Sequence, residues 1–290
     1  MSFELFEKEQ NIIAEAKELL SNGGINDPKS RDAFAELLKN YEKLSKSTKR
    51  LVRVSDRNEA ELNKVAKSLD EKNAMLEGLS SKLSKYLSPQ IYESIFSGEQ
   101  AVQLRTERKK LTIFFSDIKD FTATTDDLEP EDITFLVNDY LTEMSEIALK
   151  HGATIDKFIG DAVMVIFGAP KSMSTQEQRE RSVSCGLAMQ EKMQVFTKRC
   201  AEKGYPELSM RIGIHQGPAV VGNFGSDKRA DYTAIGHTVN IAARIESACE
   251  PGSVYVSGAV AEGLLQETEY AGDFELKGVK SQKPLFKVLA

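Results

Sequence analysis

The stretch Phe158-Ile-Gly-Asp-Ala-Val-Met-Val-Ile-Phe167 decides the fold of this chain, because two apolar halves flank one Gly-Asp pair. Glycine tolerates the backbone angles of a tight turn, so Gly160-Asp161 predicts a hairpin between strands at 153–159 and 162–167. Such a hairpin lifts the carboxylate of Asp161 to one end of a sheet.

A second apolar segment, Leu111-Thr-Ile-Phe-Phe-Ser-Asp-Ile118, also carries an aspartate near its end, Asp117. If this strand is a neighbour of the hairpin, the two carboxylates lie side by side. Paired carboxylates are hard oxygen ligands that suit Mg²⁺ or Mn²⁺ carrying a polyphosphate. Either aspartate alone is equally typical of a turn former or a helix cap, so the rest of the chain has to decide.

Composition limits the functional classes. The chain has 290 residues, of which 41% are hydrophobic, enough for one large domain and an accessory segment. Its formal net charge of −6, with no long run of one sign, argues against a nucleic-acid partner. No apolar run has the length of a membrane span or of a signal-peptide core. Three scattered cysteines indicate buried thiols in a reducing cytosol, so a soluble cytoplasmic protein is expected.

The first 87 residues carry helix signals. Residues 3–22 form an amphipathic helix that Gly23-Gly24 and Asp27-Pro28 separate from the rest of this helical region. A heptad register then runs unbroken from Phe34, which favours a parallel dimeric coiled coil over a helical hairpin that packs on itself. The a positions are Phe34, Tyr41, Thr48, Ser55, Leu62, Leu69, Leu76 and Leu83, and the d positions are Leu37, Leu44, Leu51, Asn58, Val65, Lys72, Leu79 and Tyr86.

We therefore divide the chain into a helical region at 1–87, a linker at 88–110 that begins with Ser88-Pro89, and a domain at 111–290. The domain alternates strand and helix patterns, and the order strand–helix–hairpin–helix–strand in its first half predicts a ferredoxin-like βαββαβ arrangement, α+β in class, with extra C-terminal strands. The expected strands are 111–118, 153–159, 162–167, 208–215, 218–223, 230–235, 254–257, 270–277 and 284–289, and the expected helices are 130–151, 175–203, 238–249 and 258–265.

The glycines of Gly213-Ile-His-Gln-Gly217 predict a tight turn between strands 208–215 and 218–223. Within this segment His215 is interpreted as structural, because the residues around it are typical of a core strand.

Three further places offer polar side chains for a ligand. Lys157, beside Asp156, is either a surface ion-pair partner or a donor to a purine ring. In the segment from Tyr232 to Glu246 we expect a strand, a turn at Gly236 and a helix capped by Thr238. Asn240 and Arg244 are spaced i, i+4 and share one face of that helix, where they suit either an ordinary salt bridge or a ribose and a phosphoryl oxygen. Lys277, next to Gly278, is a weaker candidate for binding phosphate.

Together these segments resemble the class III nucleotidyl cyclase catalytic domain over roughly residues 105–290. Several motifs occur in order, which is a more specific signal than any single motif. The matching segments are Phe115-Ser-Asp-Ile-Lys-Asp-Phe-Thr122, Asp156-Lys-Phe-Ile-Gly-Asp161, Arg211-Ile-Gly-Ile-His-Gln-Gly217, Val221-Gly-Asn223 and Tyr232 to Arg244.

The resemblance implies an adenylyl cyclase that converts ATP to 3′,5′-cyclic AMP and pyrophosphate, with two Mg²⁺ or Mn²⁺ ions per site. In this family the site lies at a dimer interface, so a head-to-tail homodimer would hold two equivalent sites. By this resemblance, Asp117, Asp161 and the carbonyl of Ile118 of one protomer bind the metals. Lys157 and Thr233 of the other protomer recognise the adenine, and Asn240 and Arg244 of that protomer orient the ribose and stabilise the transition state. Lys277 binds phosphate.

The purine preference is expected from two positions. Lys157 can donate to adenine N1 and Thr233 can accept from the 6-amino group, whereas guanine offers the reverse pattern. Guanylyl cyclases of the family typically carry Glu and Cys there, so the chain looks like the bacterial and soluble adenylyl subgroup. A guanylyl cyclase and a degenerate dimerisation module are the alternatives, although the candidate catalytic residues are all present. A diguanylate cyclase is disfavoured because no Gly-Gly-Asp/Glu-Glu-Phe-like turn occurs.

Two features concern regulation. His237 stands where the family often has Asp or Asn, and we expect this departure to be neutral. Many family members place a dimerising signalling helix directly before the cyclase domain. We therefore expect the coil to set the relative rotation of the two domains, and a signalling partner to dock on residues 1–60 if one exists.

Overall fold

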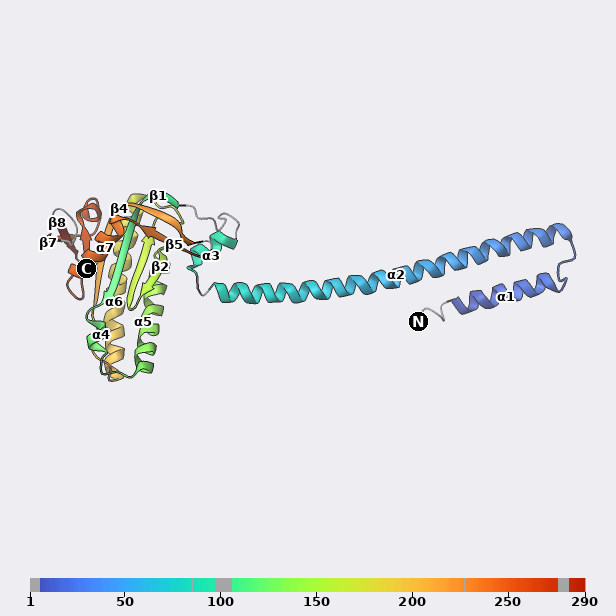
Figure 1. Cartoon of the computed structure of the whole chain (residues 1–290), viewed down its shortest axis with the longest axis horizontal. Coiled ribbons are helices and arrows are strands. Elements are labelled where there is room, and N and C mark those ends of the chain that lie inside the picture. Colours follow the sequence, from blue (N-terminus) through green and yellow to red (C-terminus); the bar gives the residue numbers. More distant parts are fainter. Residues whose placement is uncertain (1–5, 85, 97–105, 227, 276–281, 290) are drawn as a thin grey trace. The chain divides into compact units, whose positions relative to one another are not determined.

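The computed structural model describes residues 6–84, 86–96, 106–226, 228–275 and 282–289. The chain forms two compact units, Met1–Lys82 and Leu83–Ala290. The first is helical, with α1 (Glu7–Ser21) and α2 (Pro28–Leu83), as Figure 1 shows. Gly23 at φ 72° makes the turn between them, and the Asp27 carboxylate accepts a 2.9 Å hydrogen bond from the Ser30 backbone N at the start of α2.

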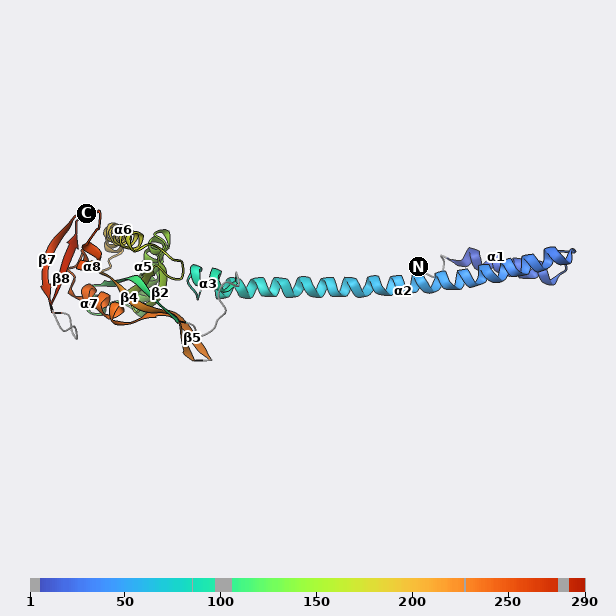
Figure 2. The ribbon, with the colours of Figure 1, turned by 90° about the horizontal axis from the view of Figure 1, so that it is seen from above.

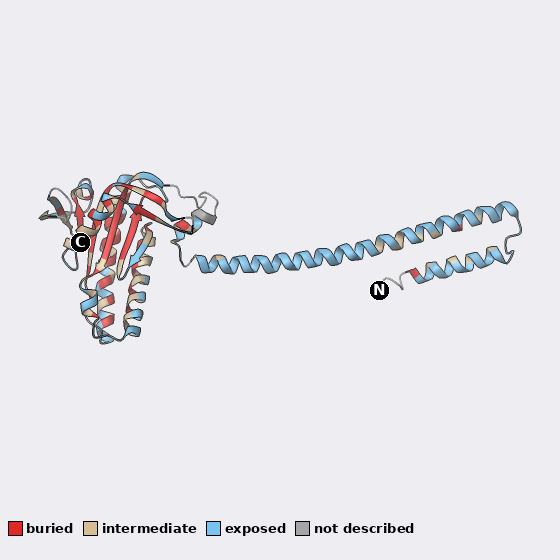
Figure 3. Cartoon of the chain, viewed as in Figure 1, coloured by how far each residue is buried: buried red, intermediate tan, exposed pale blue. Residues whose placement is uncertain are grey.

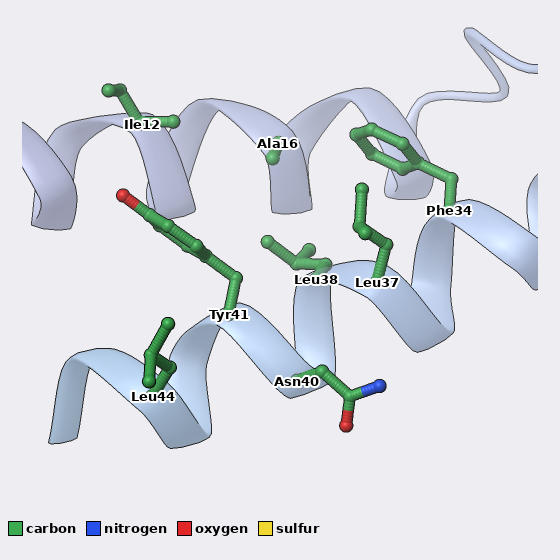
Figure 4. Close-up of a pocket in the computed structure, with 8 residues that line it drawn as sticks. All are labelled: Ile12, Ala16, Phe34, Leu37, Leu38, Asn40, Tyr41 and Leu44. Atoms are coloured by element: carbon green, nitrogen blue, oxygen red, sulfur yellow. The ribbon is translucent and has the colours of Figure 1, made fainter. Parts of the chain in front are cut away.

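Helix α1 packs against the beginning of α2. Lys17 and Glu42 form an ion pair across the two helices. Figure 4 shows Ile12 and Ala16 of α1 above Leu38 and Tyr41 of α2, where Leu38 is buried. The helical hairpin that the structure shows therefore joins α1 to the first turns of α2, and the heptad segment itself is one uninterrupted helix up to Leu83.

Helix α2 ends at Leu83, before the predicted stop at Ser88-Pro89. The Tyr86 backbone N bonds to the Leu83 carbonyl in a turn, so the last predicted d position lies outside the helix. Pro89 instead begins the short helix α3 (Pro89–Phe96), as expected for a residue whose missing N–H is not needed in a first turn.

The second unit is the predicted α+β domain with a ferredoxin-like first half, β1–α5–β2–β3–α6–β4. Its eight-stranded sheet has the order β2-β3-β1-β4-β6-β8-β7, and β5 pairs with β4 (Figure 2). The strands are β1 (Thr106–Ile118), β2 (Thr154–Ile159), β3 (Ala162–Phe167), β4 (Met210–Ser226), β5 (Arg229–Ile235), β6 (Val254–Ser257), β7 (Thr268–Phe274) and β8 (Lys283–Val288), and the helices are α4 (Phe121–Thr124), α5 (Pro130–Lys150), α6 (Thr175–Glu202), α7 (His237–Ala248) and α8 (Gly258–Ala261).

Both faces of the central strand β1 are covered. Phe114 belongs to the core formed with α5 and α6, whereas Ile113 and Phe115 belong to the opposite core, which includes Ala242 of α7. This explains why residues 111–116 of β1 are buried on both faces and do not alternate between buried and exposed. Burial colours in Figure 3 show the sheet of this unit as a buried layer.

The predicted turn between strands 208–215 and 218–223 is wrong, because β4 is one long strand that pairs with β1 from Thr106↔Gly222 to Ile118↔Met210. Pro218 is tolerated there since β6 pairs with β4 only at residues 212–214 and β5 only from residue 220. Pro218 thus occupies a part of the strand edge that the two partners leave free.

The glycines of β4 serve helix packing. A Cβ on Gly213 would lie 2.1 Å from the Glu246 backbone N, and one on Gly217 would lie 2.7 Å from Thr238 Oγ1. The absence of both side chains lets α7 lie directly on the strand.

The three cysteines, Cys185, Cys200 and Cys249, are free and buried, as predicted. Burial raises the pKa of the Cys185 and Cys249 thiols to about 12. None of the helices in the described part of the chain combines the length and the apolar character needed to cross a membrane.

Candidate active site

The two aspartates meet at one end of the sheet. Strand β3 runs antiparallel to β1, with Ser116 opposite Val163, so Asp117 lies beside the turn that joins β2 to β3. Gly160 has φ 65° in this turn, and Asp161 Oδ2 accepts a 3.1 Å hydrogen bond from the Ile118 backbone N. Burial, followed by the neighbouring Asp117 carboxyl, raises the pKa of Asp161 to about 6.

An arginine and a glutamate that sequence reasoning gave no role complete this corner. Arg211 stands opposite Asp117 in the β1–β4 register and donates to its Oδ2 through Nη2 at 2.8 Å. The same Nη2 lies 3.0 Å from Oε1 of Glu246 on α7. Burial raises the pKa of Glu246 to about 7, although Arg211 opposes the shift. The sequence does carry a signal for Arg211, which is an arginine at the start of an apolar strand. Its role becomes visible once that strand is paired with the strand that carries Asp117.

The aspartate pair fits a divalent cation. Two adjacent carboxylates, one with a raised pKa, are stabilised when a cation binds between them. Among the described residues, no cluster of three or more His, Cys, Asp or Glu side chains forms a metal cage. Two adjacent carboxylates suit a hard ion that takes its other oxygen ligands from water and phosphate, as Mg²⁺ does.

Lys157 and Thr233 come together although they are far apart in the sequence. Lys157 lies on β2 and Thr233 on β5, and Lys157 Nζ donates to Thr233 Oγ1 at 3.1 Å. The Asp156 side chain is fully buried behind them, and its Oδ2 accepts from Thr233 Oγ1 at 2.6 Å. A register shift in β2 between Ile155 and Lys157 accompanies this placement of Asp156.

Asn240 and Arg244 lie one turn apart on α7, Asn240 exposed and Arg244 half-buried. Within the described residues, neither side chain forms a hydrogen bond or ion pair with another, so both are available to a ligand. The predicted capping role of Thr238 is wrong: Gly236 is the N-cap, and buried Thr238 donates through Oγ1 to the Pro218 carbonyl at 2.7 Å.

Two histidines and one lysine complete the predicted positions. His215 Nδ1 lies 2.8 Å from Ser257 Oγ, and burial, followed by nearby His237 and Lys283, lowers its pKa to about 4, which agrees with a structural residue. His237 is exposed at the beginning of α7. Lys277 lies outside the described residues.

The candidate residues thus form separate groups. No hydrogen bond or ion pair between described residues connects the aspartate pair to Lys157, Thr233, Asn240 or Arg244. Arg211 and Glu246 link the aspartate pair to α7 instead. The aspartate pair and the Lys157–Thr233 donor and acceptor pair therefore lie in separate groups.

Comparisons with known proteins agree with this domain. Residues 104–288 match the family described as the adenylate and guanylate cyclase catalytic domain. Adenylate cyclase 1 of Rhizobium meliloti (strain 1021) is 33% identical over 63% of this chain, and adenylate cyclase of Anabaena cylindrica is 32% identical over 63%. The matched region is 28% of the first relative and 34% of the second, so the chain spans about a third or less of their length.

Solved structures give the same result. The adenylyl cyclase CyaB from P. aeruginosa is 43% identical with a TM-score of 0.63, covering 64% of this chain and 97% of that one. The guanylyl cyclase Cya2 is 36% identical with a TM-score of 0.59, covering 63% and 92%. Because the family match extends over more than half of the sequence, this chain belongs to the adenylate and guanylate cyclase catalytic domain family.

Proposed function

We propose that the chain is an adenylate cyclase that converts ATP to 3′,5′-cyclic AMP and pyrophosphate. The observation that carries the choice of ATP is the hydrogen bond between Lys157 Nζ and Thr233 Oγ1, at 3.1 Å. This pair offers an ammonium donor and a hydroxyl acceptor, which match N1 and the 6-amino group of adenine. Guanine, with a donor at N1 and an acceptor at O6, is mismatched at both atoms.

In the proposed mechanism, Asp117 and Asp161 would hold two divalent cations, and the Ile118 carbonyl would be a further ligand. When bound, Mg²⁺ or Mn²⁺ supplies Lewis-acid activation of the ribose 3′-hydroxyl and charge neutralisation of the triphosphate. The 3′-oxygen forms a bond to the α-phosphorus as its proton leaves, and the bond from that phosphorus to pyrophosphate breaks. Arg211 holds the Asp117 carboxylate in place through its 2.8 Å hydrogen bond.

Helix α7 supplies the remaining polar groups in this mechanism. Asn240 orients the ribose, and the Arg244 guanidinium stabilises the negative charge that develops on the phosphoryl oxygens. Lys277 binds the polyphosphate.

We further propose that each site is shared between two copies in a head-to-tail homodimer. The separation of the aspartate pair from the purine-reading pair within one protomer supports this arrangement. The apolar stripe of α2 offers a second surface for association as a coiled coil. The proposed location is the cytoplasm, which supplies ATP and keeps thiols such as the three free cysteines reduced.

Product analysis tests the activity. Purified full chain is incubated with ATP or GTP and with Mg²⁺ or Mn²⁺, for the wild type, Asp117→Ala and the matched control Asp120→Ala, whose carboxylate is exposed. We expect cyclic AMP from ATP, abolished only by Asp117→Ala. Cyclic GMP as the main product would instead support a guanylate cyclase, as in the Cya2 structure. No cyclic product from either nucleotide would contradict catalysis and support a binding module.

Complementation tests the sharing of sites. Asp161→Ala and Lys157→Ala proteins are each expected to be inactive. After subunit exchange, mixed dimers hold one site with both defects and one intact site, so about a quarter of wild-type activity should return. If mixing restored no activity although mass spectrometry showed mixed dimers, each protomer would hold its own site.

A further inference from the structure

The buried carboxylate of Asp156 is the feature that the proposed mechanism leaves unused. Its side chain has 0% exposure, whereas the side chain of its neighbour Lys157 is 43% exposed. A fully buried carboxylate is unfavourable unless it is paired and hydrogen-bonded. At the point where β2 and β5 approach each other, directly behind the purine-reading pair, Asp156 is hydrogen-bonded through Oδ2 and ion-paired through Oδ1, which has no hydrogen-bond partner among the described residues.

Three groups surround this carboxylate. Oδ2 accepts from Thr233 Oγ1 at 2.6 Å and from the Ala234 backbone N at 3.2 Å. Oδ1 lies 3.2 Å from Lys157 Nζ. The Ala234 amide fixes the position of Oδ2, so the hydroxyl of Thr233 meets an acceptor whose place does not depend on the ligand.

The hydrogen bond to Asp156 decides what Thr233 can offer to a base. A hydroxyl has one proton, and here the proton points at a carboxylate, which is a strong acceptor. One lone pair of Thr233 Oγ1 takes the Lys157 donor at 3.1 Å. The lone pair that remains can only accept. Without Asp156 the hydroxyl would be free to rotate and donate.

The same carboxylate acts on Lys157. The ammonium group has three donors and no acceptor, and one donor goes to Thr233 Oγ1 at 3.1 Å. Its charge lies 3.2 Å from Asp156 Oδ1 as an ion pair, although no hydrogen bond joins these two atoms. The remaining donors are left for the ligand. The pair therefore presents an ammonium donor and one acceptor of fixed polarity.

We propose that Asp156 is a positioning residue that sets the purine preference by holding Thr233 as an obligate acceptor beside Lys157, whose ammonium group can only donate. This inference rests on the proposed function, because it assumes that the pair faces a purine. Asp156 itself does not touch the nucleotide. It makes the site accept the 6-amino group of adenine and reject O6 of guanine, in the way that a site built for one hydrogen-bond pattern rejects its reverse.

The test compares kcat/KM for ATP and GTP in the full-length protein. Asp156→Ala removes the acceptor and frees the Thr233 hydroxyl to donate to O6, so the ATP/GTP ratio should fall about tenfold. Asp156→Asn keeps an oxygen that accepts from Ala234 and Thr233, so it should retain the ratio within about threefold. Asp231→Ala, on the exposed part of β5, is the matched control and should leave the ratio unchanged.

A second substitution shows whether Asp156 acts through Thr233. In a Thr233→Val background no hydroxyl remains to be oriented, so adding Asp156→Ala should change the ATP/GTP ratio by less than about twofold. A further tenfold fall in that background would overturn the proposal. An unchanged ratio in Asp156→Ala alone, or equal losses for Asp156→Ala and Asp156→Asn, would also overturn it.

The wild-type protein gives an independent readout if Asp156→Ala does not fold. Purine riboside 5′-triphosphate lacks only the 6-amino group of ATP, so an accepting Thr233 loses one hydrogen bond. We expect kcat/KM to fall roughly three- to tenfold. Equal use of the two nucleotides would overturn the proposal.

Binding separates this inference from the proposed activity. Equilibrium affinities for 3′-deoxy-ATP and 3′-deoxy-GTP, which lack the attacking hydroxyl, report the preference without turnover. If the wild type makes no cyclic product but prefers 3′-deoxy-ATP in a manner that Asp156→Ala removes, the proposed activity fails and the role of Asp156 stands. If cyclic AMP forms but the preference for 3′-deoxy-ATP is insensitive to Asp156, the proposed activity stands and the role of Asp156 fails.

Discussion

The apolar side chains of helix α2 are largely exposed, whereas those of strand β1 are buried. Phe114 and Ile113 of β1 are 0% exposed, whereas Leu62 and Leu69 of α2 are 69% and 57% exposed. Leu38 is the one described residue of α2 that is buried. The Leu83–Ala290 unit therefore completes its own core, while the long helix leaves an apolar stripe that a single chain does not cover. Within one chain, the cyclase unit thus buries its apolar side chains, whereas most apolar side chains of α2 stay exposed.

The largest expected effect concerns the core of the cyclase unit. Phe114→Ala should lower its free energy of unfolding by roughly 3–5 kcal/mol, because a fully buried aromatic ring leaves a cavity. Urea unfolding followed by near-UV circular dichroism measures this. The matched truncation Leu62→Ala, on the exposed stripe, should change the same transition by less than about 0.5 kcal/mol. Equal effects would contradict the contrast between the two units.

The second effect concerns the stripe itself. Leu62→Lys combined with Leu69→Lys places two charges on the proposed seam of the coil and should weaken the dimer on the order of a hundredfold. Sedimentation equilibrium measures the dissociation constant. Asn63→Lys with Asp70→Lys adds the same side chains one position further along and serves as control. A dimer unaffected by the seam substitutions would show that the stripe is not the interface.

A smaller effect is expected from the register of the helix. One alanine inserted after Lys72 rotates the following residues by about 100° and splits the stripe, so cyclase activity should fall several-fold. Duplication of the heptad Asn73–Leu79 lengthens the helix but keeps the stripe continuous, and activity should stay within about twofold. Cyclic AMP formation at saturating ATP is the measurement. If both insertion variants had the same activity, catalysis would not depend on a continuous apolar stripe along α2.

The smallest effect is a pH dependence within the cyclase unit. The pKa of His215 is lowered to about 4, while the unfolded chain binds this proton near pH 6.5. Between these values the unfolded state holds more protons, so stability falls as the pH is lowered from 6.5 towards 4.

His215→Gln should flatten this part of the stability curve, and thermal unfolding between pH 4.5 and 7.5 measures it. His151→Gln, at the end of α5, serves as control because His151 is not among the groups that shift the pKa of His215. An identical slope in the His215 variant would contradict the assignment.

Sequence reasoning predicted the parts of the fold that local patterns control. The Gly160-Asp161 hairpin and the helical conformation of α2 depend on neighbours in the chain, and both elements formed as expected, while the coiled coil stays a prediction. The turn expected near Gly217-Pro218 did not form. Gly217 is explained by the close packing of α7 on the strand, and Pro218 by the gap between the segments of β4 that pair with β6 and with β5. A glycine or a proline in a sequence indicates that the backbone is constrained at that position, but it does not indicate which neighbouring element imposes the constraint.

The candidate site shows the same division. Asp117 and Asp161 were expected side by side because one strand pairing brings them together. Arg211 required the register of β4 against β1, and Asp156 required the approach of β2 to β5, which no sequence pattern encodes. Asp156 next to Lys157 looked like half of a surface ion pair, and only its burial shows otherwise.

The buried cysteines give this protein a practical property. Alkylating reagents attack thiolates, and burial keeps Cys185 and Cys249 protonated and out of reach, with pKa values of about 12, while burial also raises the pKa of Cys200. A single cysteine introduced at Asn63, on exposed helix, would therefore react first in the otherwise unmodified protein. Spin labels placed there would test whether two copies of α2 associate, and at what distance, without removal of any native thiol.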